Sequence, residues 1–284
     1  MTTLRKTLFT ATFGAVLLLA TPVMALAKDF GTLHFATEAA FPPFNQSTPS
    51  GKIIGFEPDM VAELAKRVGF KYEISAQKWS GMIPGLLDEK YDAVIDGVSI
   101  TPAREQAIAF SHPYTQSISG FVTLKKGPLA VLPGDDKVIV ASDEAATASA
   151  IETLRASFKG KTIAVQVATI QADFLNKYFA DVATIRTYQA GPETFADLMN
   201  QRVDAVMASR TNFAAYVKKH PDRLTSSGYG FTGGLLGKGT AIGLRKDQTE
   251  LKAALDKALV EMINDGTLKA LSLKWFGLDV TPKA

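Results

Sequence analysis

A short stretch of the chain joins a strand end, a helix start and an arginine. Residues 96–104 read Asp-Gly-Val-Ser-Ile-Thr-Pro-Ala-Arg. Thr101 suits a helix N-cap, and Pro102 suits the first helical position. We therefore expect Ser99, nearby backbone N–H groups and Arg104 to converge on one anion-sized space, where the arginine can hold both oxygens of a carboxylate. The same pattern also fits a surface arginine on an ordinary helix.

A second segment echoes the residues that precede this turn. Residues 87–95 match residues 199–207, and each block joins a helix end, a basic turn and a strand that is followed by small polar residues. Chance could produce one such echo, but the shared context favours a repeated βα architecture. Ligands of open α/β sheets bind beyond the carboxyl ends of strands. The echo therefore indicates a site formed by residues 96–99 and 208–211.

The elements that would hold these residues alternate between strands and helices. We expect strands at residues 33–37, 72–75, 91–95, 162–166 and 184–188, and helices at residues 58–68, 81–87, 144–158 and 171–179. Lysine, glycine and proline interrupt the pattern over residues 125–136. The alternation predicts an α/β fold with mostly parallel sheets in two similar units.

The N-terminal residues are typical of a secretory signal peptide. Arg5 and Lys6 precede an uncharged run over residues 8–20, and Ala25-Leu26-Ala27 supplies the small residues of a cleavage site. We expect cleavage near Ala27 and export to the periplasm. The chain has no cysteine. Its stability should therefore come from core burial, and no lipid attachment point exists at the cleavage site.

The composition argues against several classes of partner. The formal net charge is +3, and loss of Arg5 and Lys6 leaves about +1. Without a basic stripe interleaved with aromatic residues, nucleic acid and membrane surfaces are poor candidate partners. His34, His112 and His220 are scattered, so we expect no metal site.

Several motifs together resemble a known family. They are residues 55–59 (Gly-Phe-Glu-Pro-Asp), 79–86, 99–104, 110–114 and the closing segment 265–276. With these motifs the chain resembles the type II periplasmic solute-binding proteins of the polar amino acid family, over essentially all of the mature chain. Its first strand end and its C-terminal residues are most similar to the opine (octopine and nopaline) and basic amino acid branch.

The resemblance implies two doubly wound α/β lobes joined by a two-strand hinge. One lobe would comprise residues 28–121 plus 239–284, and the other would comprise residues 122–238. Residues 118–123 would form one crossing, and the glycine-rich residues 233–243 would contain the other. Those glycines suit a segment that changes its backbone angles, and they equally suit a plain loop.

The resemblance also implies a set of ligand-binding residues. Arg104 and Ser99 would bind a carboxylate from the first lobe, and Thr169 would cap a helix and bind it from the second. The other members are Glu38, Phe41, Trp79, Asp96, Gly97 and Ser209. Glu38 between the two aromatic rings favours a cationic ligand, since a guanidinium stacks well on aromatic faces. Solvated loop and core packing are the competing interpretations of these residues.

Three positions depart from the family pattern. Ser209 stands where many amino acid binders have an aspartate for the ligand's ammonium group, so Asp96 is a possible substitute. Val167 and Ala168 replace a glycine and a small polar residue that the family often has before Thr169.

The resulting hypothesis is a monomeric receptor for a cationic amino acid or an opine. It would deliver this ligand to an inner-membrane ABC permease, with no cofactor, metal or catalytic residue. One alternative is a periplasmic enzyme on the same scaffold, similar to cyclohexadienyl dehydratase, with Glu38 or Asp96 as general acid or base. Another is a sensor protein that presents the ligand to a receptor. The sequence does not rank arginine, ornithine, lysine, histidine, octopine and nopaline.

Overall fold

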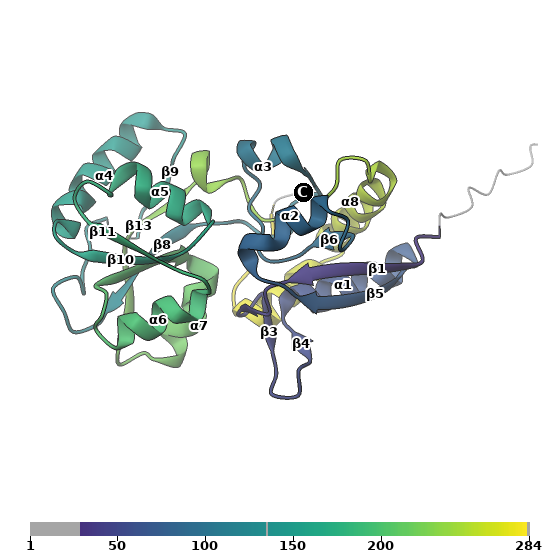
Figure 1. Cartoon of the computed structure of the whole chain (residues 1–284), viewed down its shortest axis with the longest axis horizontal. Coiled ribbons are helices and arrows are strands. Elements are labelled where there is room, and N and C mark those ends of the chain that lie inside the picture. Colours follow the sequence, from purple (N-terminus) through teal and green to yellow (C-terminus); the bar gives the residue numbers. More distant parts are fainter. Residues whose placement is uncertain (1–28, 135, 283–284) are drawn as a thin grey trace, which may run out of the picture.

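The protein consists of two α/β units that lie side by side, with a small three-stranded sheet on the first (Figure 1). The computed structural model describes residues 29–134 and 136–282. The predicted signal peptide and its cleavage near Ala27 lie outside the described residues. Within those residues, none of the helices has the length and apolar character needed to cross a membrane. The predicted α/β class is confirmed.

The first unit is built on a sheet with strand order β5-β1-β6-β14-β7. Its strands are β1 (Thr32–Thr37), β5 (Lys71–Ala76), β6 (Ala93–Val94), β7 (Ala109–Phe110) and β14 (Gly243–Leu244). β1 runs parallel to β5 and β6, and β14 runs antiparallel to β6 and β7. Its helices are α1 (Phe56–Val68), α2 (Met82–Leu87), α3 (Pro102–Ala107), α8 (Thr249–Asn264) and α9 (Thr267–Phe276). The C-terminal helices thus return to the first unit.

The second unit is built on a sheet with strand order β11-β10-β12-β8-β13-β9. Its strands are β8 (Ser119–Leu124), β9 (Val138–Val140), β10 (Thr162–Gln166), β11 (Thr184–Tyr188), β12 (Ala205–Ser209) and β13 (Leu224–Thr232). Its helices are α4 (Glu144–Phe158), α5 (Ile170–Tyr178), α6 (Gly191–Met199) and α7 (Arg210–Lys219). β10 runs parallel to β11 and β12, whereas β8 runs antiparallel to β12 and β13. Figure 1 shows α4 and α5 on one face of this sheet and α6 and α7 on the other.

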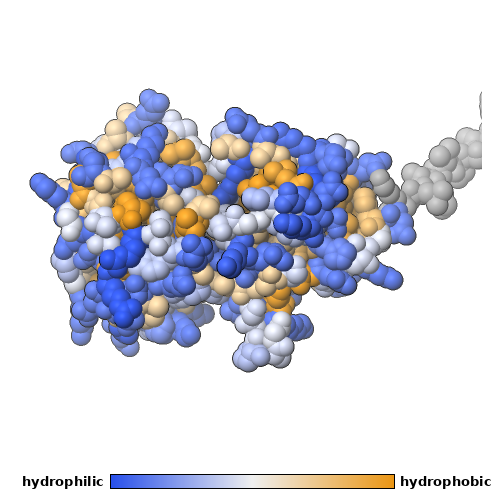
Figure 2. All heavy atoms as spheres, viewed as in Figure 1, coloured by the Kyte–Doolittle hydropathy of each residue, from blue (hydrophilic) through white to orange (hydrophobic). Residues whose placement is uncertain are grey.

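Each unit has apolar cores on both faces of its sheet. Phe35 and Phe56 pack with Leu255 of α8 on one face of the first sheet, and Met82 and Leu86 of α2 pack on the other. The second unit places a cluster of phenylalanines under α4 and α5 and a smaller cluster under α6 and α7. The visible face of the molecule in Figure 2 is largely hydrophilic, with scattered apolar side chains.

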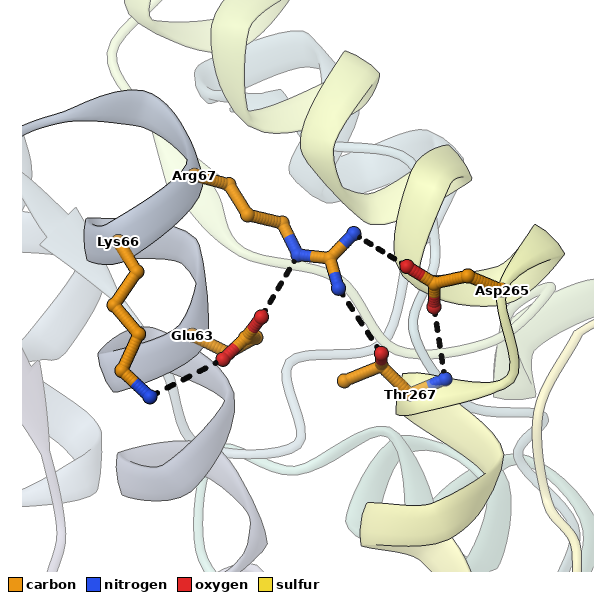
Figure 3. A network of polar contacts seen from close by, with 5 residues as sticks. All are labelled: Glu63, Lys66, Arg67, Asp265 and Thr267. Atoms are coloured by element: carbon orange, nitrogen blue, oxygen red, sulfur yellow. Dashed lines mark hydrogen bonds and ion pairs between the residues drawn. The ribbon is translucent and has the colours of Figure 1, made fainter.

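A polar network fixes the C-terminal helices to α1 (Figure 3). Arg67 Nε lies 3.0 Å from Glu63 Oε1, and Arg67 Nη1 lies 2.7 Å from Asp265 Oδ2. Its Nη2 donates to Thr267 Oγ1 at 3.0 Å. Hydrogen bonds from Thr267 and Arg67 lower the pKa of Asp265 to about 2, so its carboxylate stays ionised at neutral pH.

The two similar sequence segments, residues 87–95 and 199–207, also have similar structures. Asp92 Oδ2 accepts the backbone N–H of His34 at 2.8 Å, and Asp204 Oδ2 accepts that of Thr162 at 2.8 Å. Each aspartate therefore ties its turn to the first parallel strand of its own unit. Glu89 and Gln201, three residues before the two aspartates, both have φ near +60° (58° and 59°). The repeated βα architecture accordingly includes the backbone geometry of the turns.

Two crossing segments link the units and pair with one another. Thr240 forms antiparallel bridges with Ser99 and Thr115, and Thr232 Oγ1 donates to Ser117 O at 2.7 Å. From Ser119 onwards, β8 pairs with β12 and β13 of the second sheet. We therefore propose that the first crossing lies before residue 119, three residues earlier than the boundary expected from the sequence, and that the second lies within residues 233–240.

A candidate ligand site between the two units

A cavity lies between the units and is lined by residues from both. The predicted site residues all border it, namely Glu38, Phe41, Trp79, Asp96, Gly97, Ser99, Arg104, Thr169 and Ser209. Carboxyl ends of β1, β6, β10 and β12 meet here, as expected for ligand sites of open α/β sheets.

Arg104 supplies the positive charge of the cavity. Thr101 Oγ1 accepts the backbone N–H of Arg104 at 3.2 Å, so the predicted N-cap is present. Arg104 Nη1 donates to the backbone oxygen of Ser99 at 3.1 Å. Burial lowers the pKa of Arg104 to about 10, and Asp173 acts in the opposite direction. The guanidinium is thus charged at neutral pH, and it forms no ion pair with another of the described residues. Such a group can receive an anion.

Glu38 supplies a negative charge at another point of the cavity wall. Gln166 Nε2 of the second unit donates to both of its carboxylate oxygens, at 2.8 and 3.0 Å. Burial raises the pKa of Glu38, the hydrogen bond from Gln166 lowers it, and Glu193 raises it. The two units are therefore in direct contact through a carboxylate that no cation neutralises among the described residues.

Two aromatic rings border the cavity in different ways. Phe41 stacks on Phe44 with a centroid distance of 5.1 Å and lies against Gly97, where a Cβ atom would come within 2.7 Å of the Phe41 ring. Gly97 also has φ 57°, so glycine suits this position on two grounds. Trp79 contacts Arg104, whose Cζ atom lies 5.2 Å from the ring centroid.

Trp79 also reaches across to the second unit. Its indole N–H donates to the backbone oxygen of Ala168 at 3.0 Å. Ala168 has φ 58°, a left-handed conformation that glycine adopts more easily. The turn before Thr169 therefore keeps a glycine-like conformation although an alanine occupies the position.

Thr169 uses its hydroxyl group within its own turn. The hydroxyl donates to Gln166 O at 2.8 Å and accepts the backbone N–H of Ala172 at 3.2 Å, so Thr169 caps α5. Ser209 Oγ likewise forms a hydrogen bond with Thr211 Oγ1 at 2.7 Å. Because its hydroxyl group is already used, Thr169 can best serve a ligand by positioning the free backbone N–H groups in the first turn of α5.

Asp96 is less available to a ligand than the sequence suggested. It is only 5% exposed, and its Oδ1 accepts hydrogen bonds from Thr37 Oγ1, the Glu38 N–H and Asn45 Nδ2 at 3.2, 3.1 and 2.7 Å. One carboxylate oxygen is thus committed to the fold, and at most the other can face a ligand. Asp96 therefore lies at the cavity floor as part of a buried polar cluster.

The sequence analysis did not identify several residues that line the cavity, most of them from the second unit. The further polar groups that line the cavity are Ser117, Gln166, Gln171, Thr194, Asn212 and Thr240. Asn212 Nδ2 donates across the cavity to Pro42 O at 2.6 Å. Applying the strand-end rule to β10 and β11, as well as to β6 and β12, would have indicated Gln166 and the segment that contains Thr194. Within the described residues no group of His, Cys, Asp and Glu is arranged to hold a metal ion.

Sequence comparison places this chain among binding proteins. The family model for bacterial extracellular solute-binding proteins, family 3, matches residues 33–278. The octopine-binding periplasmic protein of Rhizobium meliloti is 38% identical over 272 residues, which cover 88% of this chain and 92% of the relative. The L-cystine-binding protein TcyJ of Escherichia coli is 34% identical, covering 89% and 86%. The histidine-binding periplasmic protein of Salmonella typhimurium is 30% identical, covering 93% and 95%.

Solved structures show the same architecture. An ancestral arginine-binding protein bound to arginine superposes with a TM-score of 0.72 at 31% identity, covering 87% of this chain and 99% of the other. A periplasmic His/Glu/Gln/Arg/opine family-binding protein from Silicibacter pomeroyi in complex with lysine gives a TM-score of 0.72 at 30% identity, covering 88% and 100%.

Proposed function

Because the chain belongs to family 3 of the bacterial extracellular solute-binding proteins, we propose that it binds a cationic amino acid or an opine derived from one. It is the solute-binding component of an amino acid ABC importer, and we propose that it acts in the periplasm as a monomer that delivers its ligand to an inner-membrane permease. The matched relatives named for octopine and histidine, and the structures bound to arginine and lysine, support this ligand class.

The separation of opposite charges within one cavity carries the proposal. Arg104 offers a half-buried guanidinium that forms no ion pair among the described residues, which suits the carboxylate of an amino acid. Glu38 offers a carboxylate that accepts hydrogen bonds from a neutral amide and forms no ion pair within the described residues, which suits a cationic side chain. A ligand with both charges would satisfy both groups. Phe41 and Trp79 supply ring surface for the segment between them.

This proposal requires no covalent chemistry. The enzyme alternative would need Glu38 to exchange a proton with the ligand, and burial does raise the pKa of that carboxyl. The family membership and the unpaired guanidinium favour binding over turnover. Recovery of unchanged L-arginine after a long incubation with the protein would exclude that alternative for this ligand, whereas a new product would support it.

A ligand panel tests the proposal. Protein that has been unfolded and refolded, to remove ligand carried through purification, is titrated calorimetrically with L-arginine, L-lysine, L-histidine, octopine, L-cystine and L-citrulline. L-Citrulline has the shape of arginine but an uncharged side chain, so it is the matched neutral control. We expect at least one cationic compound or octopine to bind at least about tenfold more tightly than L-citrulline. Equal affinity for L-arginine and L-citrulline, with tighter binding of L-cystine, would contradict the proposed ligand class.

A further inference from the structure

Two carboxyl groups are buried together beneath the floor of the cavity. Glu57, in the first turn of α1, is 0% exposed, and Asp96 is 5% exposed. The amide nitrogen of Asn45 donates to Glu57 Oε2 at 2.8 Å and to Asp96 Oδ1 at 2.7 Å. Because a single nitrogen atom contacts both carboxyl groups, the two groups are close neighbours in a region with little access to water.

The surroundings of this pair contain donors but no positive charge. Tyr114 OH and the Gly97 N–H donate to Glu57 Oε1, the second at 2.7 Å. The hydroxyl of Thr37 and the N–H of Glu38 donate to Asp96. The charged and titratable groups that face the pair are Glu38 after β1 and Tyr114 after β7, and Glu193 of α6 lies near Glu38. No lysine, arginine or histidine within the described residues forms an ion pair with either carboxyl, and Arg104 contacts Ser99 and Trp79 instead.

Two buried carboxylates without a cation cannot both be ionised at low cost. Burial raises the pKa of both groups, and the charge of Glu57 raises that of Asp96 further. Asn45 Oδ1 is buried and receives no hydrogen bond from the described residues, so the cluster lacks one donor. A proton on either carboxyl would relieve the repulsion, and after rotation of the amide it could also satisfy this oxygen.

We propose that Glu57 and Asp96 share one proton in the ligand-free protein and release it to solvent when the positively charged nitrogen of a ligand docks at the cavity floor beside Asp96. The O–H bond breaks, the proton passes to water or buffer, and the ligand's cation replaces its charge. Glu57 is then a positioning residue for cation selectivity that acts through Asp96. The inference rests on the proposed cationic ligand.

The release of a proton has a direct calorimetric signature. L-Arginine is titrated into the refolded protein at one pH near neutrality, in phosphate and in Tris buffer, whose ionisation enthalpies differ. We expect the binding heats in the two buffers to differ by the difference in their ionisation enthalpies, multiplied by about one proton released per ligand bound. Below the pKa of the pair, the affinity should rise by up to about tenfold for each unit by which the pH is raised. Binding with identical heats in both buffers overturns the proton linkage and leaves the proposed function intact. Failure of L-arginine, L-lysine, L-histidine and octopine to bind overturns the proposed function and the linkage with it.

Three variants assign the proton to this pair. Glu57→Gln and Asp96→Asn should each abolish most of the buffer dependence. Glu105→Gln, the same chemical change at an exposed position of α3, should retain it. Retention of full proton release in both pair variants would overturn the assignment.

A ligand-free measurement tests the shared proton without any binding step. Because the folded pKa of each carboxyl lies above its usual value, the folded protein holds more protons than the unfolded chain. The free energy of unfolding should therefore fall as the pH rises from the ordinary carboxyl range through the raised pKa of the pair. Urea unfolding between pH 5 and pH 8 should show a steeper decline for wild type than for Glu57→Gln or Asp96→Asn. Profiles of equal slope in all three proteins would overturn the proposal.

Discussion

The two walls of the cavity differ in charge although both are formed by strand ends and the segments after them. Among the described residues, the ionisable side chains that line it all come from the first unit, namely Glu38, Asp96 and Arg104. The second unit contributes neutral polar groups, among them Gln166, Thr169, Thr194, Ser209 and Asn212. The structural repeat therefore extends to the backbone and to the aspartates of the turns, but not to the ligand-binding chemistry.

Because of this difference, we expect the first wall to recognise the charges of the ligand and the second wall to hold the two units together around it, which we call closure. Hydrogen bonds to charged groups contribute more than neutral ones, so most of the ligand's binding energy should come from the first wall. Three residue pairs of the described chain are hydrogen-bonded across the cavity, and they link Gln166 with Glu38, Ala168 with Trp79 and Asn212 with Pro42. Each contact joins the two units directly and is expected to break when they separate.

Removing the positive charge of the first wall should have the largest effect. Arg104→Ala is expected to weaken L-arginine binding by about 100-fold or more, because the ligand carboxylate would remain desolvated without a partner. Arg104→Lys should recover only part of the loss, since an ammonium cannot form the two parallel hydrogen bonds. Calorimetric titration checks both variants. Wild-type affinity in Arg104→Ala would show that the second wall binds the carboxylate.

Removing the negative charge of Glu38 should change selectivity more than overall affinity. Glu38→Gln is expected to weaken L-arginine binding by about tenfold while changing L-citrulline binding by less than about threefold, because only the cationic side chain loses an ionic partner. Competition between the two ligands measures the ratio. Equal losses of affinity for L-arginine and L-citrulline would mean that Glu38 supports closure through Gln166 and does not distinguish charged from neutral side chains.

A single contact between the walls should contribute less. Trp79→Phe removes the hydrogen bond to Ala168 but keeps an aromatic ring beside Arg104. We expect a loss of about 1 kcal/mol in ligand binding, or roughly fivefold. Trp275→Phe is the matched control, because Trp275 donates a hydrogen bond to Asp59 and neither residue lines the cavity. Equal effects of the two substitutions would argue against a role of this contact in closure.

The turn of the second wall should be the least sensitive position. Ala168→Gly removes the strain of an alanine at φ 58° but adds backbone freedom to the unfolded chain. The two effects largely offset each other, so the free energy of unfolding should change by less than about 1 kcal/mol, with L-arginine affinity nearly unchanged. Gln201→Gly, at φ 59° outside the cavity lining, is the control in urea unfolding. A large loss of affinity in Ala168→Gly but not in Gln201→Gly would show that the second wall contributes more to ligand recognition than its neutral groups suggest.

Much of the fold followed from local signals. The predicted helix at residues 144–158 and the strands at residues 162–166 and 184–188 match α4, β10 and β11, because periodicity and flanking turns act over a few residues. The small sheet of β2 (Ala40–Phe41), β3 (Asn45–Ser47) and β4 (Ile53–Ile54) was not predicted. Strands of two or three residues are too short for alternation to be visible.

The candidate site was predictable on one wall more than on the other. Arginine, glutamate and aromatic residues after strands are distinctive, so the first wall was largely identified. Glutamine, threonine and asparagine occur in many loops, so Gln166, Thr194 and Asn212 carried no comparable signal. For Asp96 the residue was found but its environment was not, since its partners Thr37 and Asn45 come from distant parts of the chain.

The sequence by itself determined the turn that presents Arg104, the cap at Thr169 and the repeat that relates the two units. These features depend on residues a few positions apart, where capping and periodicity leave a pattern in the letters. Only the tertiary structure decided that Gln166 meets Glu38, that Trp79 reaches Ala168 and that Asn45 bridges Glu57 and Asp96. Those contacts join residues far apart in the chain, and their energies depend on burial and proximity, which arise only when the strands and helices assemble.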